Sequence, residues 1–414
     1  MGVSWRLLKN MVLSMNVKKC LALIMVFGLL SVAFLSTTKT CMFSSNCYHS
    51  KTSGKLISQS RRQIEIKLPR NFEKPGIYGF NEILTRPEKI PDRLLFLVII
   101  ASSAAGEIDK ARRDAIRNTW GDCHGKELTN KLVGSKLIEP SNTRGMDGEI
   151  SKYNYCRVIF NVGLSKDTEQ QKSVLRESSK HGDILIGNVI ENYRNMTLKL
   201  RTGFTFAAGV LARYIVKADS DVYINLPKLA KLLANDADLP DTLYGGFPYR
   251  GIVVRDATHR HFVQIEDYNG TYYPEFCKGS MVVLSGNIIP NLVTAFTHIK
   301  PFNIDDAYLG ITLNKLSVPP IRINQFVQFQ YLPVMLDFLH LCDFSWLIGV
   351  GDSLSPSQMK RVHELMGWSQ DLPSWMCWHF GVLGHIFLIF AMLFFYVSVN
   401  KLVLAEDICD NSKL

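Results

Sequence analysis

The stretch Val216-Lys217-Ala218-Asp219-Ser220-Asp221-Val222-Tyr223 places two carboxylates one residue apart at the end of an apolar run. Residues 214–218 are predicted to form a buried strand, in which alternate side chains point to opposite faces. Asp219 and Asp221 are therefore expected to point the same way at the carboxyl end of the strand, where open α/β sheets bind ligands. Two carboxylates there suit Mn²⁺ or Mg²⁺, which can hold a diphosphate. The alternative is a solvated turn before a helix that opens at residues 225–227.

Strands and helices are expected to alternate upstream of this motif. Apolar runs predict strands over residues 94–100, 156–162, 183–186 and 214–218, and helices are predicted over residues 110–120, 167–180 and 195–211. This order implies an α/β fold in which helices cover both faces of a mostly parallel sheet. No Gly-x-Gly-x-x-Gly follows the first strand and no Walker-type lysine loop occurs, which argues against a dinucleotide-binding dehydrogenase and a P-loop nucleotidase.

Composition sets the broad class of protein. The 414 residues are 47% hydrophobic and 20% charged, which is typical of a globular protein with a membrane contribution. The formal net charge is +10, but the basic residues are scattered and form no block interleaved with aromatics. Nucleic-acid binding is therefore not expected, and the positive charge is available for a nucleotide diphosphate, acidic glycans or anionic lipid.

Two apolar segments are candidates for membrane spans. Residues 20–38 carry no charge and follow several basic residues, which predicts an uncleaved signal anchor with a cytosolic N-terminus. A cleaved signal peptide is the alternative. Residues 379–400 are predicted as a second transmembrane helix, because the segment is apolar on all sides. The expected order is cytosolic tail (1–19), signal anchor (20–38), stem (39–91), catalytic domain (92–345), luminal extension (346–378), second transmembrane helix (379–400) and tail (401–414).

Cysteines and sequons agree with a luminal body. Seven of the nine cysteines lie between the two apolar segments, where disulfides form, and an odd number leaves at least one without a partner in the chain. Asn195-Met196-Thr197 and Asn269-Gly270-Thr271 are glycosylation sequons.

Five blocks occur in the order and spacing of a known enzyme family. Residues 113–121 resemble its Arg-x-x-Ile-Arg-x-Thr-Trp block, and residues 181–199 resemble its Gly-Asp-Ile and Tyr-x-Asn-Leu-Thr-x-Lys blocks. Residues 217–225 resemble its aspartate-rich metal motif, residues 273–280 its Tyr-Pro-x-Tyr-x-x-Gly block, and residues 304–310 its acidic-Asp-Val-Tyr-x-Gly block. Over about residues 93–320 the chain resembles the inverting β-1,3-glycosyltransferases, which include β-1,3-galactosyl- and β-1,3-N-acetylglucosaminyltransferases.

This resemblance implies a GT-A fold and a hexosyltransferase of the Golgi membrane with a luminal catalytic domain. The enzyme would move a sugar from a UDP-sugar to a hydroxyl of a glycan on a glycoprotein or glycolipid, with inversion and with Mn²⁺ or Mg²⁺ as cofactor. UDP-galactose is the favoured donor and UDP-N-acetylglucosamine the alternative, while assembly into a homo-oligomer stays open. A catalytically silent nucleotide-sugar- or glycan-binding membrane protein and a structural membrane scaffold are the competing classes.

The resemblance also assigns roles to acidic residues. Asp219 and Asp221 become the metal ligands, with Asp221 preferred as the direct one, and Ser220 stands where the family usually has a third aspartate. Asp306 becomes the catalytic base, with helix capping by Asp305 or Asp306 as the alternative.

Donor-binding candidates come from several blocks. Arg113 and Arg117 lie one helical turn apart and could face the donor, although structural ion pairs are an equal alternative. The other candidates are Lys199, Ala101, Ser102 and Gly279. Trp120 is expected in the core and Asn195 as a glycosylation site. Two departures from the family are Thr312 in place of a frequent cysteine, and the lack of a histidine before the Ser-Pro block near residue 355.

Overall fold

The computed structural model describes residues 76–104, 106–123, 154–235, 239–328 and 341–369, all within one compact unit that spans Gln63–Leu414. The predicted membrane segments 20–38 and 379–400 and most of the stem lie outside the described residues. None of the described helices combines the length and the apolar character that a bilayer crossing needs.

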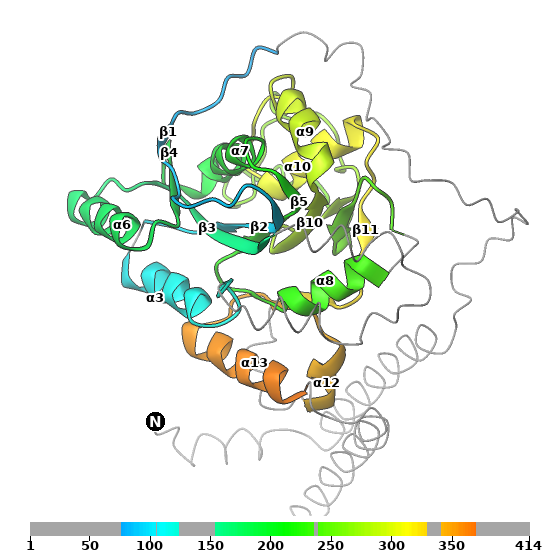
Figure 1. Cartoon of the computed structure of the whole chain (residues 1–414). Helices are drawn as coiled ribbons and strands as arrows, with labels where there is room; N and C mark the ends of the chain where they lie inside the picture. Colours follow the sequence, from blue (N-terminus) through cyan, green and yellow to red (C-terminus); the bar gives the residue numbers. More distant parts are fainter. Residues whose placement is uncertain (1–75, 105, 124–153, 236–238, 329–340, 370–414) are drawn as a thin grey trace, which may run out of the picture. The chain divides into compact units, whose positions relative to one another are not determined.

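An eight-stranded sheet in the order β1-β4-β3-β2-β5-β10-β7-β11 forms the centre of the fold (Figure 1). Its strands are β1 (Ile83–Thr85), β2 (Leu94–Ala101), β3 (Asn154–Leu164), β4 (Ile184–Ile190), β5 (Ala212–Asp219), β7 (Tyr244–Gly246), β10 (Met281–Ser285) and β11 (Ile321–Arg322). The four predicted strands are confirmed as β2, β3, β4 and β5, and they are parallel to their neighbours among themselves. The sheet as a whole is mixed, because β1 and β10 run antiparallel to theirs.

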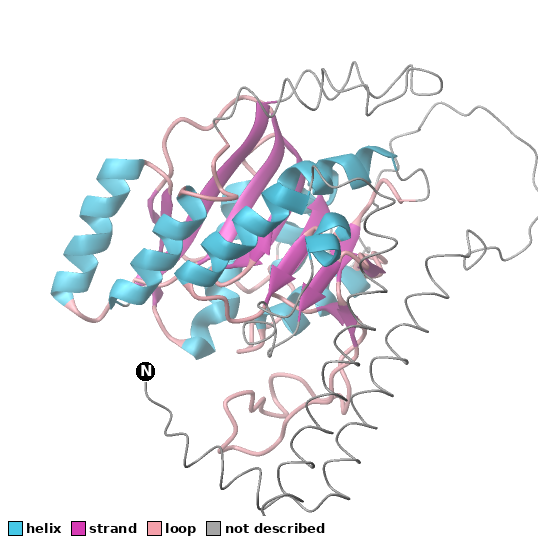
Figure 2. Cartoon of the chain, turned by 90° about the horizontal axis from the view of Figure 1, so that it is seen from below, coloured by secondary structure: helices cyan, strands magenta, loops and turns pink. Residues whose placement is uncertain are grey.

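Helices cover both faces of the sheet, as Figures 1 and 2 show, so the expected three layers are confirmed. One face carries α3 (Gly106–Arg117), α6 (Thr168–His181), α8 (Leu226–Asn235), α12 (Leu341–Trp346) and α13 (Pro356–Trp368). The other carries α7 (Met196–Ala207), α9 (Ile289–Phe296) and α10 (Asp305–Lys315). Strand β2 contributes Val98 to the first core and Leu97 to the second. Its apolar run is therefore continuous because both of its faces are buried.

Helix boundaries follow local chemistry. Asp167 caps α6 by accepting hydrogen bonds from the backbone of Glu169 and Gln170, and Gly182 ends it with a left-handed backbone (φ 62°). Helix α7 stops at Ala207, short of the predicted end at residue 211, and Gly209 follows the C-cap residue Ala208. A glycine costs about 1 kcal/mol relative to alanine inside a helix, which favours a stop at this place.

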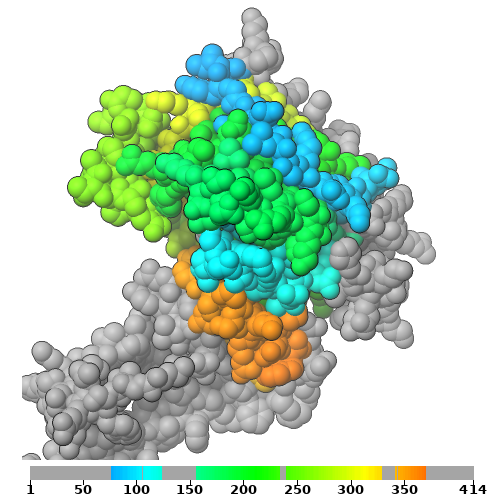
Figure 3. All heavy atoms as spheres, turned by 90° about the vertical axis from the view of Figure 1, so that its left-hand side faces the viewer, coloured from blue at the N-terminus to red at the C-terminus, as the bar shows by residue number. Residues whose placement is uncertain are grey.

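The C-terminal part of the described chain joins the same core. A three-stranded sheet pairs β12 (Phe326–Gln328) with β13 (Gly349–Gly351) and β13 with β6 (Tyr223–Ile224). Helix α13 begins with a Ser355–Gln358 capping box and packs on α3, its orange surface lying against the cyan of α3 in Figure 3. Described residues beyond 345, which the sequence placed in an extension, thus contribute to the same hydrophobic core as α3 and the central sheet.

A small pair of strands and two short helices complete the described elements. Strands β8 (Pro248–Tyr249) and β9 (Phe276–Cys277) pair antiparallel, and the 3-10 helices are η2 (Tyr193–Asn195) and η3 (Gly286–Ile288).

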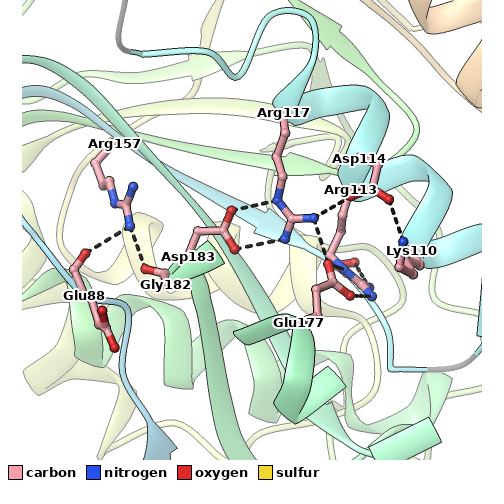
Figure 4. Close-up of polar contacts among 10 residues, drawn as sticks. Glu88, Lys110, Arg113, Asp114, Arg117, Arg157, Glu177, Gly182 and Asp183 are labelled. Carbon is pink, nitrogen blue, oxygen red and sulfur yellow. Dashed lines mark hydrogen bonds and ion pairs between the residues drawn. The ribbon is translucent and has the colours of Figure 1, made fainter. Parts of the chain in front are cut away.

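A buried ion network ties α3 to α6 and β4 (Figure 4). Arg113 donates two hydrogen bonds to Glu177 at 2.8 and 2.6 Å. Arg117 lies 2.8 Å from the same carboxylate and donates to both oxygens of Asp183 at 2.8 and 2.9 Å. Burial opposes ionisation of Glu177, but the two guanidinium groups outweigh it and hold the pKa of the carboxyl below its usual value.

Removing the Glu177 carboxylate is expected to destabilise the fold strongly. Glu177→Ala leaves Arg113 buried without its partner, and breaking such a pair costs about 3–5 kcal/mol. The free energy of unfolding in urea measures the loss. The matched control is Glu169→Ala, which removes an exposed ion pair of the same helix with Lys172 and should cost less than about 1 kcal/mol. Equal losses of unfolding free energy in both variants would show that the buried network does not stabilise the fold more than an exposed ion pair does.

Candidate active site

Lys217 lies at the centre of the site, with its ammonium group almost fully buried. Its Nζ atom donates to Asp219 Oδ1 at 3.1 Å and to the Gly279 carbonyl at 2.5 Å, and lies 3.4 Å from Asp305 Oδ2. These partners come from the end of β5, from the turn after β9 and from the first turn of α10. One cation therefore joins three segments that are distant in the sequence.

The two aspartates of the motif have different neighbours. Strand β5 ends at Asp219, and Asp221 lies in the turn beyond it, so the expected alternation of a strand does not reach Asp221. Asp219 contacts Lys217, whereas Asp221 Oδ2 lies 3.9 Å from a guanidinium nitrogen of Arg112. Burial raises the pKa of Asp219 to about 6 against the opposing charge of Lys217, although 36% of its side chain stays exposed. Burial also raises the pKa of Asp221, with Asp352 adding to the shift.

Asp352 is a third carboxylate at this place, and it comes from the residue after β13. Its Oδ1 atom accepts a hydrogen bond of 2.8 Å from the Ser280 hydroxyl. The Ser280 carbonyl in turn accepts from the Asp219 backbone at 3.0 Å. Among the described residues, no three His, Cys, Asp or Glu side chains are arranged to hold a metal by themselves.

Asp306 lies beside the lysine cluster in the first turn of α10. The N-cap of this helix is Ile304, so neither Asp305 nor Asp306 occupies the capping position. Asp306 accepts hydrogen bonds from the Ala307 backbone at 2.8 Å and from the Gly279 backbone at 3.3 Å. Burial and the negative charge of Asp305 raise the pKa of Asp306 to about 7, against the opposing charge of Lys217. A carboxylate of that pKa is matched to accept a proton near neutral pH.

Gly279, which the sequence predicts as a donor-binding residue, packs closely against Lys217 and Asp306. A Cβ atom at this position would lie 2.9 Å from Lys217 Nζ and 3.1 Å from Asp306 Cβ. The missing side chain thus lets Lys217 and Asp306 approach the backbone of the turn, which is the close approach that glycine permits.

A pocket opens between the sheet, α7 and the start of α10. It brings two of the sequence-predicted donor residues, Ala101 and Lys199, together with Lys217 and Asp305. Its complete lining is Ile99, Ala101, Asn161, Met196, Lys199, Leu200, Phe204, Lys217 and Asp305. The cavity has a volume of about 10 Å³, which is the space of a single water molecule, so it shows where these side chains meet and is too small for a nucleotide sugar.

The polar groups of Lys199 and Ser102 already have partners within the protein. Lys199 Nζ lies 2.9 Å from Glu191 Oε2 and donates to the Ser102 carbonyl at 2.7 Å. The Ser102 backbone nitrogen donates to the Asn161 carbonyl at 3.1 Å, so both backbone groups of Ser102 take part in hydrogen bonds within the protein. Ala101 lines the pocket and stays the better placed of the two.

Arg113 and Arg117 follow the structural alternative of the sequence analysis. All three guanidinium nitrogens of Arg113 donate hydrogen bonds to Glu177, Ser102 or Ser103. Burial lowers the pKa of Arg117, but Asp183 and Glu177 outweigh it and raise the pKa above the ordinary value. A donor contact by either arginine stays a prediction without geometric support. Arg112 is the arginine of α3 that approaches the motif.

Sequence reasoning missed Lys217, Asp305, Asp352 and Arg112. Lys217 carried a usable signal, because it stands two residues before Asp219 on a strand and therefore on the same face. Asp352 could not be identified from the sequence, because only the pairing of β13 with β6 brings it close to Asp221.

The structure also describes other residues that the sequence singled out. Trp120 is buried in the core, as expected. Cys123 pairs with Cys156, Cys342 is also disulfide-bonded, and Cys277 is a buried free cysteine. The Asn195 side chain donates to the Ile190 carbonyl at 2.9 Å.

Lys217→Met is expected to destabilise the protein more at pH 8 than at pH 5. Without the ammonium, the pKa of Asp219, which burial already raises, rises further in the folded state. The folded chain then binds more protons than the unfolded chain across this range, so stability falls as pH rises. Thermal unfolding at both pH values measures the difference. The control Lys172→Met removes an exposed lysine of α6 and should show no such pH dependence. A pH-independent loss in Lys217→Met would contradict the ion cluster.

Comparison with known proteins identifies the family of the chain. The sequence profile of the galactosyltransferase family matches residues 111–324, more than half of the chain. The chain is 26% identical over 288 residues to β-1,3-galactosyltransferase 1 of Mus musculus and to that of Homo sapiens, covering 69% of this chain and 78% of each relative. It is 28% identical over 294 residues to β-1,3-galactosyltransferase 2 of Homo sapiens, covering 69% of this chain and 62% of that relative.

A solved structure also aligns with the chain. The inositol-1-phosphate CTP transferase from T. maritima gives a TM-score of 0.28 at 11% identity and covers 67% of this chain and 97% of its own. The family match and the named relatives carry the assignment. The chain belongs to the galactosyltransferase family and is a glycosyltransferase related to the β-1,3-galactosyltransferases.

Proposed function

We propose that the protein transfers galactose from UDP-galactose to a hydroxyl of a glycan acceptor, with inversion and formation of a β-1,3 linkage. The acceptor glycan would be carried by a glycoprotein or glycolipid in the Golgi lumen, with the chain anchored in the membrane by residues 20–38. One observation carries the proposal. The carboxyl of Asp306, whose pKa is raised to about 7, lies beside the Lys217–Asp219 ion pair at one edge of the sheet.

Asp306 has the position and basicity of a general base. In a single displacement the acceptor hydroxyl gives its proton to an Asp306 carboxylate oxygen, while the hydroxyl oxygen forms a bond to the anomeric carbon. The bond between that carbon and the UDP oxygen breaks, and UDP leaves with the electron pair, so that the configuration inverts. The hydrogen bonds from Gly279 and Ala307 hold the carboxylate in one orientation, which is the positioning that an in-line reaction needs.

Asp219 and Asp221 fit a hard divalent cation. Both side chains are oxygen donors, and 36% and 24% of their surfaces are exposed. Their raised pKa values mean that the surrounding protein compensates their negative charges incompletely, which a cation would relieve. Mn²⁺ or Mg²⁺ held there supplies charge neutralisation of a departing diphosphate. Arg112, 3.9 Å from Asp221, adds a second positive charge to the same place.

A donor screen tests the proposal directly. The full chain in detergent is incubated with each UDP-sugar and a glycan acceptor panel, and release of UDP is measured with and without Mn²⁺. We expect UDP release from UDP-galactose that depends on both acceptor and Mn²⁺. Release of UDP from UDP-N-acetylglucosamine and from no other UDP-sugar would identify UDP-N-acetylglucosamine as the donor in place of UDP-galactose. Donor binding without release under any condition would favour the catalytically silent binder, for which Ser220 in the acidic motif is the sequence signal.

Asp306→Asn should abolish transfer while leaving UDP-galactose binding intact, because the amide cannot take the acceptor proton. The same variant should unfold at a higher temperature than wild type at pH 8. The pKa of Asp306 rises from 3.8 to about 7 on folding, so ionisation of this buried carboxyl opposes folding as pH rises through that window.

Asp221→Ala provides the contrast, since it should weaken Mn²⁺-dependent UDP binding measured by calorimetry. If Asp306→Asn keeps wild-type turnover, Asp306 is not the catalytic base.

A further inference from the structure

Four side chains form a basic aromatic patch outside the site described above: Phe247, Tyr249, Lys278 and Arg322. The Lys278 ammonium lies 5.2 Å from the ring centroid of Phe247 and 5.5 Å from that of Tyr249. The Arg322 guanidinium lies 4.4 Å from the Phe247 centroid. Two cations therefore share one aromatic ring, an arrangement that orders their charged ends. One guanidinium nitrogen of Arg322 donates to the Pro248 carbonyl at 3.4 Å.

The charges of the patch have no acidic partner among the described residues. No described carboxylate lies within 4.0 Å of Lys278 or Arg322, although the exposed Glu275 stands close by in the sequence. The Tyr249 side chain is 45% exposed and offers surface beside the two cations. Two adjacent positive charges without a paired carboxylate favour an anionic ligand.

The patch lies on the same edge of the sheet as the catalytic residues. Strand β11 is parallel to β7, and β7 and β5 are each antiparallel to β10, so β5, β7 and β11 end at one edge. Figure 1 shows β5, β10 and β11 following one another across the sheet. The end of β7 lies two strand spacings from the end of β5, about 10 Å, which is the length of about two sugar rings.

The backbone links the patch to Asp306 directly. The Lys278 backbone nitrogen donates to the Phe247 carbonyl at 3.0 Å. The next residue, Gly279, donates its backbone nitrogen to Asp306 at 3.3 Å. A ligand on the patch is thus one residue of backbone away from the segment that orients the proposed base.

We propose that the basic aromatic patch binds an anionic substituent of the acceptor glycan, a sulfate, phosphate or carboxylate group, with a sugar ring against Tyr249. The inference rests on the proposed glycosyl transfer and adds the acceptor class: acidic glycans are preferred over their neutral counterparts. The diphosphate of the donor is already accounted for at Asp219 and Asp221. The link to Asp306 favours the acceptor over a lipid headgroup as the source of the anion.

The test compares binding of matched acceptors by the full chain in detergent with UDP present. The probes are N-acetyllactosamine and its 6-O-sulfated form, and a glucosyl and a glucuronosyl disaccharide. The acidic member of each pair should bind about tenfold more tightly, as expected for one hydrogen-bonded charge pair. Lys278→Gln and Arg322→Gln should each remove most of this preference. The control Lys315→Gln removes an exposed lysine from the last turn of α10 and should leave it unchanged.

Thermal unfolding of each variant confirms that the surface changes leave the fold intact. Equal binding of acidic and neutral acceptors by the wild type, or a preference that survives both patch variants, would overturn the inference. A loss of binding to phosphatidylserine vesicles in the patch variants, with the glycan preference unchanged, would assign the patch to a membrane surface instead. UDP release in the donor screen reports on the proposed function separately. A preference for acidic acceptors without any turnover would support the assignment of the patch and contradict the proposed transferase activity.

Discussion

A buried ammonium group surrounded by carboxylates organises the candidate active site of this protein. Burial lowers the pKa of Lys217, but the charges of Asp219 and Asp305 outweigh it and raise the pKa above the ordinary lysine value, so the group stays charged. A charged group in such a place is stable only with partners, and here the partners come from β5, from the turn at Gly279 and from α10. Whatever moves one of these three segments also moves the other two.

The same constraint explains why several acidic side chains can lie so close together. Asp219 and Asp306 are both raised in pKa by burial, yet each has Lys217 as an opposing charge. Without Lys217, the negative charges of Asp219, Asp305 and Asp306 would repel one another at short range. In the proposed mechanism, Lys217 would let Asp306 keep a pKa near neutral pH while Asp219 faces a cation. Proton transfer and diphosphate binding would then depend on the same buried lysine.

A second buried network shows that charge burial is not by itself a sign of catalysis. Arg113, Arg117 and Glu177 are as strongly paired as the Lys217 cluster, but they join helices to the sheet on the opposite face. Every guanidinium nitrogen of Arg113 is used within the protein. The difference is exposure at the edge, because Asp219 keeps an accessible surface while the Arg113–Glu177 pair has almost none.

The amino-acid sequence by itself determined the alternation of elements, the central strands β2 to β5 and the acidic motif at the end of β5. It also determined the family, through blocks such as residues 304–310 that hold Asp306. These are local properties, since the periodicity of apolar residues and short motifs need no knowledge of the rest of the chain. Only the tertiary structure decided what surrounds them. Lys217 became the centre of the site because α10 and the Gly279 turn fold against β5, and Asp352 reached Asp221 because β13 pairs with β6. Electrostatic partners are chosen by distance in space, and distance in space between residues far apart in the chain is fixed only when the sheet and its layers are packed.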